Sequence, residues 1–441
     1  MDYGRFAGVL CLTLAGCDGS AVPGASAGTD GPGETDSAGE TDGPGETDGP
    51  GETDGPGETD GTGETEGPGE TEGGQDICEG LSGELLTSTQ IDQPEPIDLA
   101  LDPTSDTGEF YVSYRGPDCV SRHSADGQEL SRLPGESCDQ LAIDSAGNLL
   151  LAGLDSRNGG SRITKRDSDG EEQWAYVLSE GLSSALRLDV AVDGDDNVLV
   201  AGTDRSGDDA GWITKLDAAG AEQWTVRLGG RAVENGRISI TTHGDEDVTV
   251  AHALEVEDAD GLVRVSRFDG TGQEQWSVDF SDPRARVDGM DTDDTGRVAV
   301  GLYAYDDAGG PRRSLVLLSP QGTLEWTRTS DELPIQITTA VAFAPCNTIV
   351  MAGTADATPD ATAFGRQLWA TKLADDGTEL WTSFMDGPLD SSEVGDGIRA
   401  IAIDAAGQIT AAGAVTVEIN ESQDEKFPVN DIDLWLGRFD A

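Results

Sequence analysis

LDVAVDGDDNVLVAGT (188–203) and GWITKLDAAGAEQWTVRLGG (211–230) together form one copy of a unit that recurs about every fifty residues along most of this 441-residue chain. Each copy has four apolar runs, rich in Val, Ile and Leu, that are separated by turns of Asp, Gly and Asn. A repeat of this length with four strands per unit is typical of a blade in a β-propeller. No stretch has the periodicity of an amphipathic helix. We therefore predict an all-β protein.

A glycine followed four residues later by a tryptophan marks the last strand of each clear copy. The five pairs are Gly170 and Trp174, Gly220 and Trp224, Gly272 and Trp276, Gly322 and Trp326, and Gly377 and Trp381. Glycine provides the positive φ of a tight hairpin, and we expect the tryptophan to be buried between neighbouring blades. Two weaker copies keep the glycine without the aromatic residue, at Gly127 and Gly83. The last strands therefore number seven.

The first strands of the copies lead independently to the same number. Their ranges are 97–102, 140–144, 188–193, 237–242, 287–292, 339–344 and 398–404. Most are followed by a polar turn and a second apolar run, as in the first two strands of a blade. We predict a seven-bladed β-propeller of four-stranded blades over residues 77–441.

The two ends of the repeat region complement each other. The last copy ends at LWLGRFDA (434–441) without a fourth strand, and SGELLTSTQ (82–90) resembles the fourth strand DGTELWTSF (376–384). We predict that the N-terminal strand completes the last blade, which would leave no unpaired sheet edge at the seam. The alternative is that residues 82–90 are a linker.

Two copies carry a family resemblance. AIDSAGNLLLAG (142–153) and AVDGDDNVLVAG (191–202), each followed by an ITK-type hairpin, resemble the bacterial seven-bladed propeller repeats called SBBP repeats. The resemblance covers about residues 80–441; the fourth copy departs from it at Thr242 and His243, and the sixth has APCN (344–347) at the turn. It implies a propeller in an envelope or extracellular setting and no particular reaction. GTELW and GAEQW also look like repeats of quinone-cofactor propellers, which usually have eight blades.

Residues 1–16 are predicted to be a lipoprotein signal peptide. A short apolar stretch ends in Leu14, Ala15, Gly16 and Cys17, which resembles the lipobox of bacterial lipoproteins. Cleavage before Cys17 would let this residue carry the acyl chains that anchor the protein to a membrane. The alternatives are an ordinary signal peptide or a membrane span, but a run of about nine apolar residues is too short to cross a bilayer that needs about 20. We expect a cell-envelope lipoprotein of a Gram-negative bacterium, at the outer membrane or cell surface.

Residues 17–76 are predicted to be a disordered tether. GPGETD repeats dominate this segment, which has no Lys or Arg and too few apolar groups to offset the entropy of ordering. The whole chain has a formal net charge of −58, and most of the excess belongs to the repeat region. Such a surface disfavours nucleic acid and favours cations and basic partners. The alternative explanation of the charge is adaptation to a salty medium. We expect a monomer.

Four cysteines remain after Cys11 in the signal peptide and Cys17 are set aside. They are Cys78, Cys119, Cys138 and Cys346, and four cysteines allow three pairings. In a propeller, Cys119 and Cys138 would lie on the loop face of the first blade, whereas Cys78 and Cys346 would lie on the turn face near the seam. We therefore predict a disulfide between Cys119 and Cys138 and a second, between Cys78 and Cys346, that locks the ring closure.

The search for catalytic and metal-binding motifs gives little. His123, His243 and His252 have no zinc-binding spacing, and no serine lies in a recognisable nucleophile motif. The acidic turns 193–197 and 291–296 could suggest calcium, but Val198 stands where a calcium loop needs Gly and Leu302 where it needs an acid. We expect ordinary Asp-rich turns and no cofactor, with calcium as the alternative.

Long loops point to a binding surface on one sector of the ring. The connections 354–367, 386–397 and 415–433 are expanded, and function is often located on loops of a rigid scaffold. The candidate binding residues are Arg366, Asp390, Glu393, Glu418, Glu421, Asp424, Glu425 and Lys426. The alternative is that these loops are tolerated insertions. We expect a non-catalytic binding or scaffold module for an unknown protein or glycan; the alternative is a propeller enzyme, quinoprotein-like or a lyase, that uses the central channel.

Overall fold

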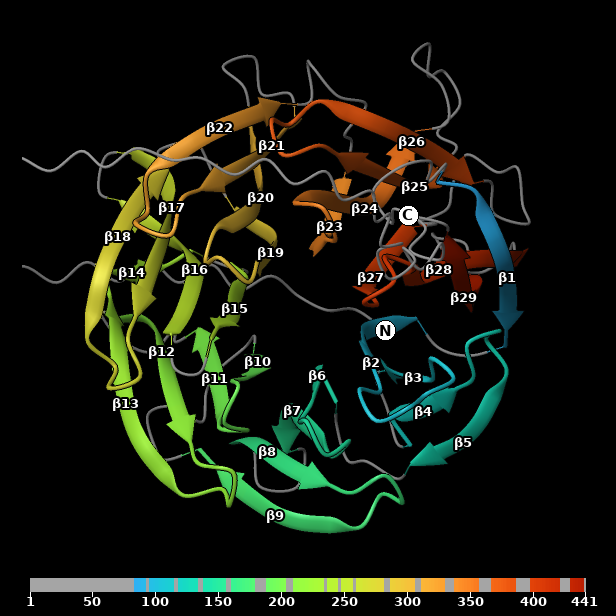
Figure 1. The fold of residues 1–441 in the computed structure, drawn as a ribbon, viewed down its shortest axis with the longest axis horizontal. Coiled ribbons are helices and arrows are strands. Elements are labelled where there is room, and N and C mark those ends of the chain that lie inside the picture. The colour runs from blue at the N-terminus through green and yellow to red at the C-terminus, as the bar shows by residue number, and fades with distance from the viewer. Residues whose placement is uncertain are drawn as a thin grey trace, which may run out of the picture. The chain divides into compact units, whose positions relative to one another are not determined.

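Seven antiparallel sheets form a ring in the computed structural model (Figure 1). The structure describes residues 83–439 except 93–94, 115–117, 134–137, 156–159, 179–187, 204–208, 234–235, 245–246, 257–258, 281–285, 306–310, 330–336, 357–365, 386–396 and 421–428. The chain divides into units 1–70 and 71–441, and every described residue belongs to the second. The predicted seven-bladed propeller is therefore confirmed.

Each blade has four strands, and these follow one another in chain order from the centre of the ring to its rim. Blade 1 consists of β2 (Pro96–Leu101), β3 (Phe110–Tyr114), β4 (Val120–His123) and β5 (Glu129–Leu133). Blade 2 consists of β6 (Gln140–Ile143), β7 (Leu149–Asp155), β8 (Gly160–Arg166) and β9 (Glu172–Val177). Blade 3 consists of β10 (Leu188–Val192), β11 (Val198–Thr203), β12 (Asp209–Leu216) and β13 (Glu222–Gly229). Blade 4 is β15 (Ile238–His243), β16 (Asp247–Val256), β17 (Ala259–Phe268) and β18 (Glu274–Phe280), with the short β14 (Arg231–Ala232) also paired to β16. Blade 5 consists of β19 (Arg286–Thr292), β20 (Val298–Tyr305), β21 (Pro311–Leu318) and β22 (Leu324–Thr329). Blade 6 consists of β23 (Ile337–Ala344), β24 (Thr348–Asp356), β25 (Arg366–Leu373) and β26 (Glu379–Met385).

The seventh blade joins the two ends of the described chain. Its order is β27 (Gly397–Ile403), β28 (Ile409–Asn420), β29 (Val429–Phe439) and β1 (Leu85–Ile91). Strand β1 pairs antiparallel with β29 from Leu85 opposite Phe439 to Ile91 opposite Leu434. In Figure 1 the blue β1 lies outside the red β29 at the rim. The predicted closure is confirmed, and the linker alternative for this segment is wrong.

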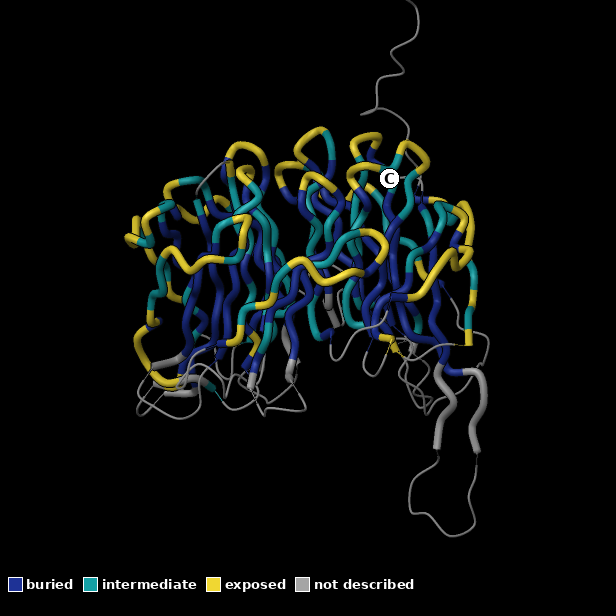
Figure 2. Tube along the Cα trace, turned by 90° about the horizontal axis from the view of Figure 1, so that it is seen from below, coloured by how far each residue is buried: buried dark blue, intermediate teal, exposed yellow. Residues whose placement is uncertain are grey.

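The core lies between the blades. One apolar cluster combines Leu150 and Ile163 of blade 2 with Val198 and Trp212 of blade 3, all at most 1% exposed. Equivalent clusters join other neighbouring blades. Figure 2, a side view of the ring, shows buried segments at half its height and exposed turns at its upper face. The β-branched and aliphatic residues of the repeat therefore form blades because both faces of each sheet are covered by neighbours.

The repeated tryptophan lies on the next blade's hairpin. The indole of Trp174 packs on Gly220 and donates a hydrogen bond to the carbonyl of Ala218 (3.1 Å). Trp224 and Trp276 make the equivalent bonds to the following blade. These indoles are half-buried rather than buried as predicted, because the outermost strand leaves one side of the ring open to solvent. The contact links each last strand to the next hairpin.

The cysteines are oxidised where the structure describes them. Cys119 and Cys138 form a disulfide with a Cα–Cα distance of 5.7 Å, as predicted. Cys346 is also disulfide-bonded. Its predicted partner Cys78 lies outside the described residues, as do Cys17, the signal peptide and the tether, so these remain predictions. Within the described residues, no helix is long and apolar enough to span a bilayer.

Replacing both Cys119 and Cys138 by Ser is expected to lower the free energy of unfolding by about 3 kcal/mol, because the bond closes a loop between residues 19 apart in sequence. Urea denaturation followed by circular dichroism measures the loss. Repeating the measurement with reductant opens all disulfides in both proteins, and as the control it should abolish the difference between them. An unchanged denaturation midpoint in the double variant would contradict the prediction.

Candidate functional site

The predicted loop cluster lies mostly outside the described residues. Arg366 begins β25, and Glu418 lies in β28 with its backbone opposite Asp431. The predicted loop bounds 415–433 are wrong, because residues 415–420 and 429–433 pair with each other as extensions of β28 and β29. The other six candidates, Asp390, Glu393, Glu421, Asp424, Glu425 and Lys426, are outside the description. Whether these residues form one binding surface therefore remains a prediction.

The acidic turns between the first and second strands have a structural role. Oδ1 of Asp144 accepts hydrogen bonds from the amides of Ala146 (3.0 Å) and Asn148 (2.8 Å), which closes the hairpin. Its Oδ2 forms a buried ion pair with Nζ of Lys165 (2.7 Å). Blade 3 repeats this arrangement with Asp193 and Lys215 (2.9 Å). In the described part of the chain, no three His, Cys, Asp or Glu residues gather in a metal-binding cluster; the expectation of no cofactor remains a prediction.

Three acids of the innermost strands connect neighbouring blades, and no local pattern in the sequence distinguishes them from the other acids. Oδ1 of Asp98 accepts from the amide of Leu99 (2.8 Å), and its Oδ2 accepts from the amide of Leu141 in the next blade (3.0 Å). Asp189 and Asp291 bridge blade 3 to blade 4 and blade 5 to blade 6 in the same way. Because the blades have separate backbone ladders, these carboxylates satisfy amides at the inner edges.

The bridging acids titrate far from their ordinary range. Burial raises the pKa of Asp189 to about 7, against the hydrogen bond from Ile240, and the charge of Asp98 raises it further. Burial likewise raises the pKa of Asp98 and of Asp291 to about 6. These groups therefore bind protons in the folded protein at pH values where an unfolded chain has released them.

The propeller is expected to be more stable at pH 5 than at pH 7.5. Between about pH 4 and 7 these carboxyls bind more protons in the folded state than in the unfolded chain, so their contribution to the free energy of unfolding falls as the pH rises. Burial lowers the pKa of His123 and His252, and these two groups act in the opposite direction. Melting temperatures at the two pH values measure the difference, and Asp189→Asn should reduce it. Asp169→Asn, at an exposed turn, is the control and should leave the difference unchanged. An equal difference in wild type and Asp189→Asn would contradict this assignment.

Two of the three histidines have hydrogen-bond partners in the protein. Nε2 of His123 lies 2.5 Å from the Ser121 hydroxyl, and its Nδ1 lies 3.2 Å from the carbonyl of Gly127. Both Ser121 and His123 are fully buried, so this serine and histidine have no access to a substrate. Nδ1 of His243 lies 3.1 Å from the carbonyl of Asp293 and so joins the hairpins of blades 4 and 5.

His252 differs from both because it interrupts the repeat. Four other blades have glycine at this position of the second strand: Gly153, Gly202, Gly353 and Gly413. In blade 3 the indole of Trp212 lies over Gly202, where an added Cβ would be 2.4 Å from the ring. In blade 4 the residue opposite His252 is Arg264 instead of tryptophan. The volume that an indole fills in blade 3 is thus left to a smaller imidazole and an arginine.

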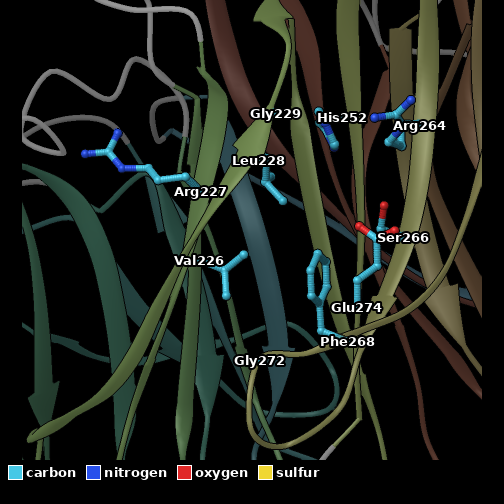
Figure 3. A pocket seen from close by; sticks show the side chains of 10 residues that line it. All are labelled: Val226, Arg227, Leu228, Gly229, His252, Arg264, Ser266, Phe268, Gly272 and Glu274. Atoms are coloured by element: carbon cyan, nitrogen blue, oxygen red, sulfur yellow. The ribbon is translucent and has the colours of Figure 1, made fainter. Parts of the chain in front are cut away.

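A cavity of about 200 Å³ lies between blades 3 and 4 beside His252 (Figure 3). Val226 and Leu228 of β13 line one side, and Phe268 of β17 lines the other. Arg264 reaches it from β17, but its guanidinium is paired through Nε and Nη2 with both carboxylate oxygens of Asp279, at 2.7 and 2.8 Å. Arg227, Ser266 and Glu274 also line this space, so its wall combines apolar, polar and charged side chains.

The imidazole of His252 has no hydrogen-bond partner within the described structure. It is 1% exposed, and both Nδ1 and Nε2 are unsatisfied. Burial lowers its pKa to about 4, and the charge of Arg264 lowers it further. At neutral pH the ring is thus uncharged, with one N–H donor and one acceptor nitrogen. A buried polar group without a partner is costly, and neither nitrogen is accessible to a water-sized group, so His252 destabilises the fold at this position.

Comparisons with known proteins assign neither a family nor a function to this chain. No protein-family model and no curated protein match this chain. Among solved structures, a polysaccharide lyase described as an ulvan lyase is similar over 78% of this chain and 95% of its own, with 13% identity and a TM-score of 0.49. A second ulvan lyase structure, described as bound to a GlcA–Rha3S repeat, matches over 80% of this chain and 94% of its own, with 12% identity and a TM-score of 0.46. A eukaryotic initiation factor matches over 72% and 74%, with 9% identity and a TM-score of 0.39.

Proposed function

We propose that this protein is a non-catalytic binding or scaffold module of the cell envelope, anchored through lipid on Cys17. The observation that supports binding is the hollow of about 200 Å³ between blades 3 and 4, which apolar side chains line together with Arg227, Ser266 and Glu274. A catalytic base is normally hydrogen-bonded to a nucleophile and to an orienting group. His252 has neither contact in the described structure, and its low pKa makes it a weak base.

The envelope part of the proposal rests on the N-terminal sequence and on oxidised cysteines. Leu14, Ala15, Gly16 and Cys17 have the form of a lipobox. The disulfide between Cys119 and Cys138 is of a kind that persists in exported proteins and is rare in reducing cytosol. Both observations favour an exported, lipid-anchored propeller.

Detergent phase partition of the protein expressed with its own N-terminus tests the anchor. The wild-type chain is expected in the detergent phase and labelled by radioactive fatty acid. Cys17→Ser is expected in the aqueous phase without label, and Cys11→Ser serves as the matched control that should retain both. A wild-type chain without fatty acid would refute the anchor.

Incubation of the full-length protein with native envelope polysaccharide and with crosslinked envelope proteins tests binding against catalysis. We expect retention of a partner whose size is unchanged, and loss of that retention when residues 421–428 are deleted, which leaves the strand residues of β28 and β29 in place. Shortened polysaccharide chains, or reduction of a dye after addition of quinone and calcium, would favour the enzymatic alternative. Full retention by the deletion variant would exclude this loop from the binding surface.

A further inference from the structure

We propose that the rim of blades 6, 7 and 1 is a docking surface for a basic amphipathic helix of a partner protein. Its apolar part is a leucine band, which consists of Leu380 of β26, Leu86 of β1 and Leu130 of β5. These side chains are 53%, 48% and 51% exposed, respectively. The band includes none of the residues that line the space between blades 3 and 4, so it adds a second surface to the proposed function.

A β-bulge places each of these leucines at the same position of its blade. In β26 the pairing with β25 passes from Glu379 to Trp381 and skips Leu380. The last strands of all seven blades have this irregularity, and a bulge re-aims the side chain of the unpaired residue. The residues at this position in blades 2 to 5 are polar: Gln173, Gln223, Gln275 and Glu325. Leucine is thus confined to three consecutive blades.

The three strands follow one another along the rim and are connected by contacts between blades (Figure 1). The indole of Trp381 in β26 lies against Gly83, just before β1. The hydroxyl of Thr89 in β1 donates to the carbonyl of Asp126, in the hairpin before β5 (3.3 Å). Single exposed leucines are ordinary, whereas these form a row, and Phe384 of β26 adds a fourth exposed apolar side chain. The row is therefore a candidate docking surface.

The charges beside the leucine band favour a basic partner. Each leucine lies within two residues of an exposed glutamate, namely Glu379, Glu84 and Glu129. Among the described residues of β26, β1 and β5, Arg132 is the one cation, and its Nε and Nη2 are both bonded to Glu129. The whole chain has a net charge of −58, which would repel a second copy or an anionic bilayer. Lys and Arg beside an apolar stripe would instead meet these acids.

The bulges favour docking of a helix over addition of a strand. Strands β26, β1 and β5 are the outermost strands of their sheets, and an exposed edge can in general accept another strand. A bulge interrupts the ladder and twists the edge away, and here the bulged residue is the exposed leucine itself. An amphipathic helix needs no backbone pairing and presents its apolar side chains in one stripe, which the leucine band can cover.

Fluorescence anisotropy with a labelled helical peptide tests the docking surface. The probe is a peptide of about 18 residues, made of Leu and Lys with the leucines on one face. The protein is the full-length chain with Cys17→Ser, which avoids acyl chains and detergent. Leu86→Gln, Leu130→Gln and Leu380→Gln are combined in one variant, which changes no charge and is compatible with the fold because blades 2 to 4 have glutamine there. We expect this triple variant to bind the peptide at least about tenfold more weakly.

Val177→Gln combined with Leu324→Gln is the matched control, because these side chains are as exposed as the leucine band but lie on the rim of blades 2 and 5. It should bind the peptide as the wild type does. A second peptide of the same composition, with its leucines spread around the helix, should bind the wild type as weakly as the first binds the triple variant. Equal affinity of the two peptides for the wild type, an unchanged affinity in the triple variant, or an equal loss in the control would each overturn the proposal.

Two further measurements test other occupants of the leucine band. The protein with Cys17→Ser is expected to sediment as a monomer and not to float with phosphatidylglycerol vesicles. Self-association that the triple variant abolishes would assign the band to a second copy of the chain. Vesicle binding that the triple variant abolishes would assign it to a bilayer. Either result would refute the basic helix as its partner.

Discussion

Lys165→Met is expected to lower the free energy of unfolding by about 3–5 kcal/mol, because it removes one partner of a buried ion pair. Nζ of Lys165 lies 2.7 Å from Oδ2 of Asp144, and the two side chains are 6% and 1% exposed. The same ammonium donates to the carbonyl of Ala218 in the next blade (3.3 Å). The substitution leaves a buried carboxylate with its hydrogen bonds from Ala146 and Asn148 but without its counter-charge, and it removes a bond between blades.

Urea denaturation at pH 7 measures this loss, and Arg231→Met is the matched control. The pair of Arg231 with Glu255 has side chains 73% and 43% exposed, and such pairs contribute about 0–1 kcal/mol. A loss in Lys165→Met no larger than in Arg231→Met would show that the buried pair does not stabilise the ring.

The pair also has a predicted pH dependence. Burial alone would raise the pKa of Asp144, but the hydrogen bonds from Lys165 and Asn148 and the lysine charge outweigh it and hold the pKa below its ordinary value. A lowered pKa means stability that is present above the ordinary pKa and lost as the pH falls through the folded one. The difference between wild type and Lys165→Met should therefore shrink in strong acid.

Gly220→Ala is expected to lower the free energy of unfolding by about 2–4 kcal/mol, from backbone strain and overpacking together. Gly220 has a φ of +83°, and an added Cβ would lie 2.6 Å from Cδ2 of Trp174. The indole cannot move away without losing its hydrogen bond to Ala218. The substitution therefore separates two blades as well as straining a turn.

Gly244→Ala separates the two causes. Gly244 has a φ of +59°, but an added Cβ would meet no atom within 4 Å, so only the backbone cost of about 1 kcal/mol is expected. Chemical denaturation of both variants gives the comparison. Equal losses at the two glycines would mean that the contact with Trp174 contributes nothing.

Blade number, strand order and ring closure could be predicted because most blades contain a short sequence pattern that identifies their strands. The glycine and tryptophan four residues apart identify the last strand of five blades, and the apolar run after each turn identifies the second. The missing fourth strand after residue 439 and the surplus one at 85–91 then require each other, since an unpaired edge is unfavourable. The pairing of Cys119 with Cys138 followed from the same topology.

The candidate site was less predictable because it depends on contacts between blades. His252 stands out when the repeats are aligned, since glycine occupies its position in four other blades and Arg264 replaces an indole opposite it. That comparison could have been made from the sequence, but the size of the resulting cavity could not. It depends on how closely Val226 and Leu228 of blade 3 approach β17.

By itself, the sequence determined the number and order of the strands, because turn residues and apolar runs act within a few positions of each other. The tertiary structure alone decided which groups the ring leaves unsatisfied. Asp98, Asp189 and Asp291 are bonded across blades to amides more than forty residues away in sequence, whereas His252 has no partner among the described residues. Burial and hydrogen bonding of such groups depend on packing between blades, and packing depends on distances that no local pattern contains.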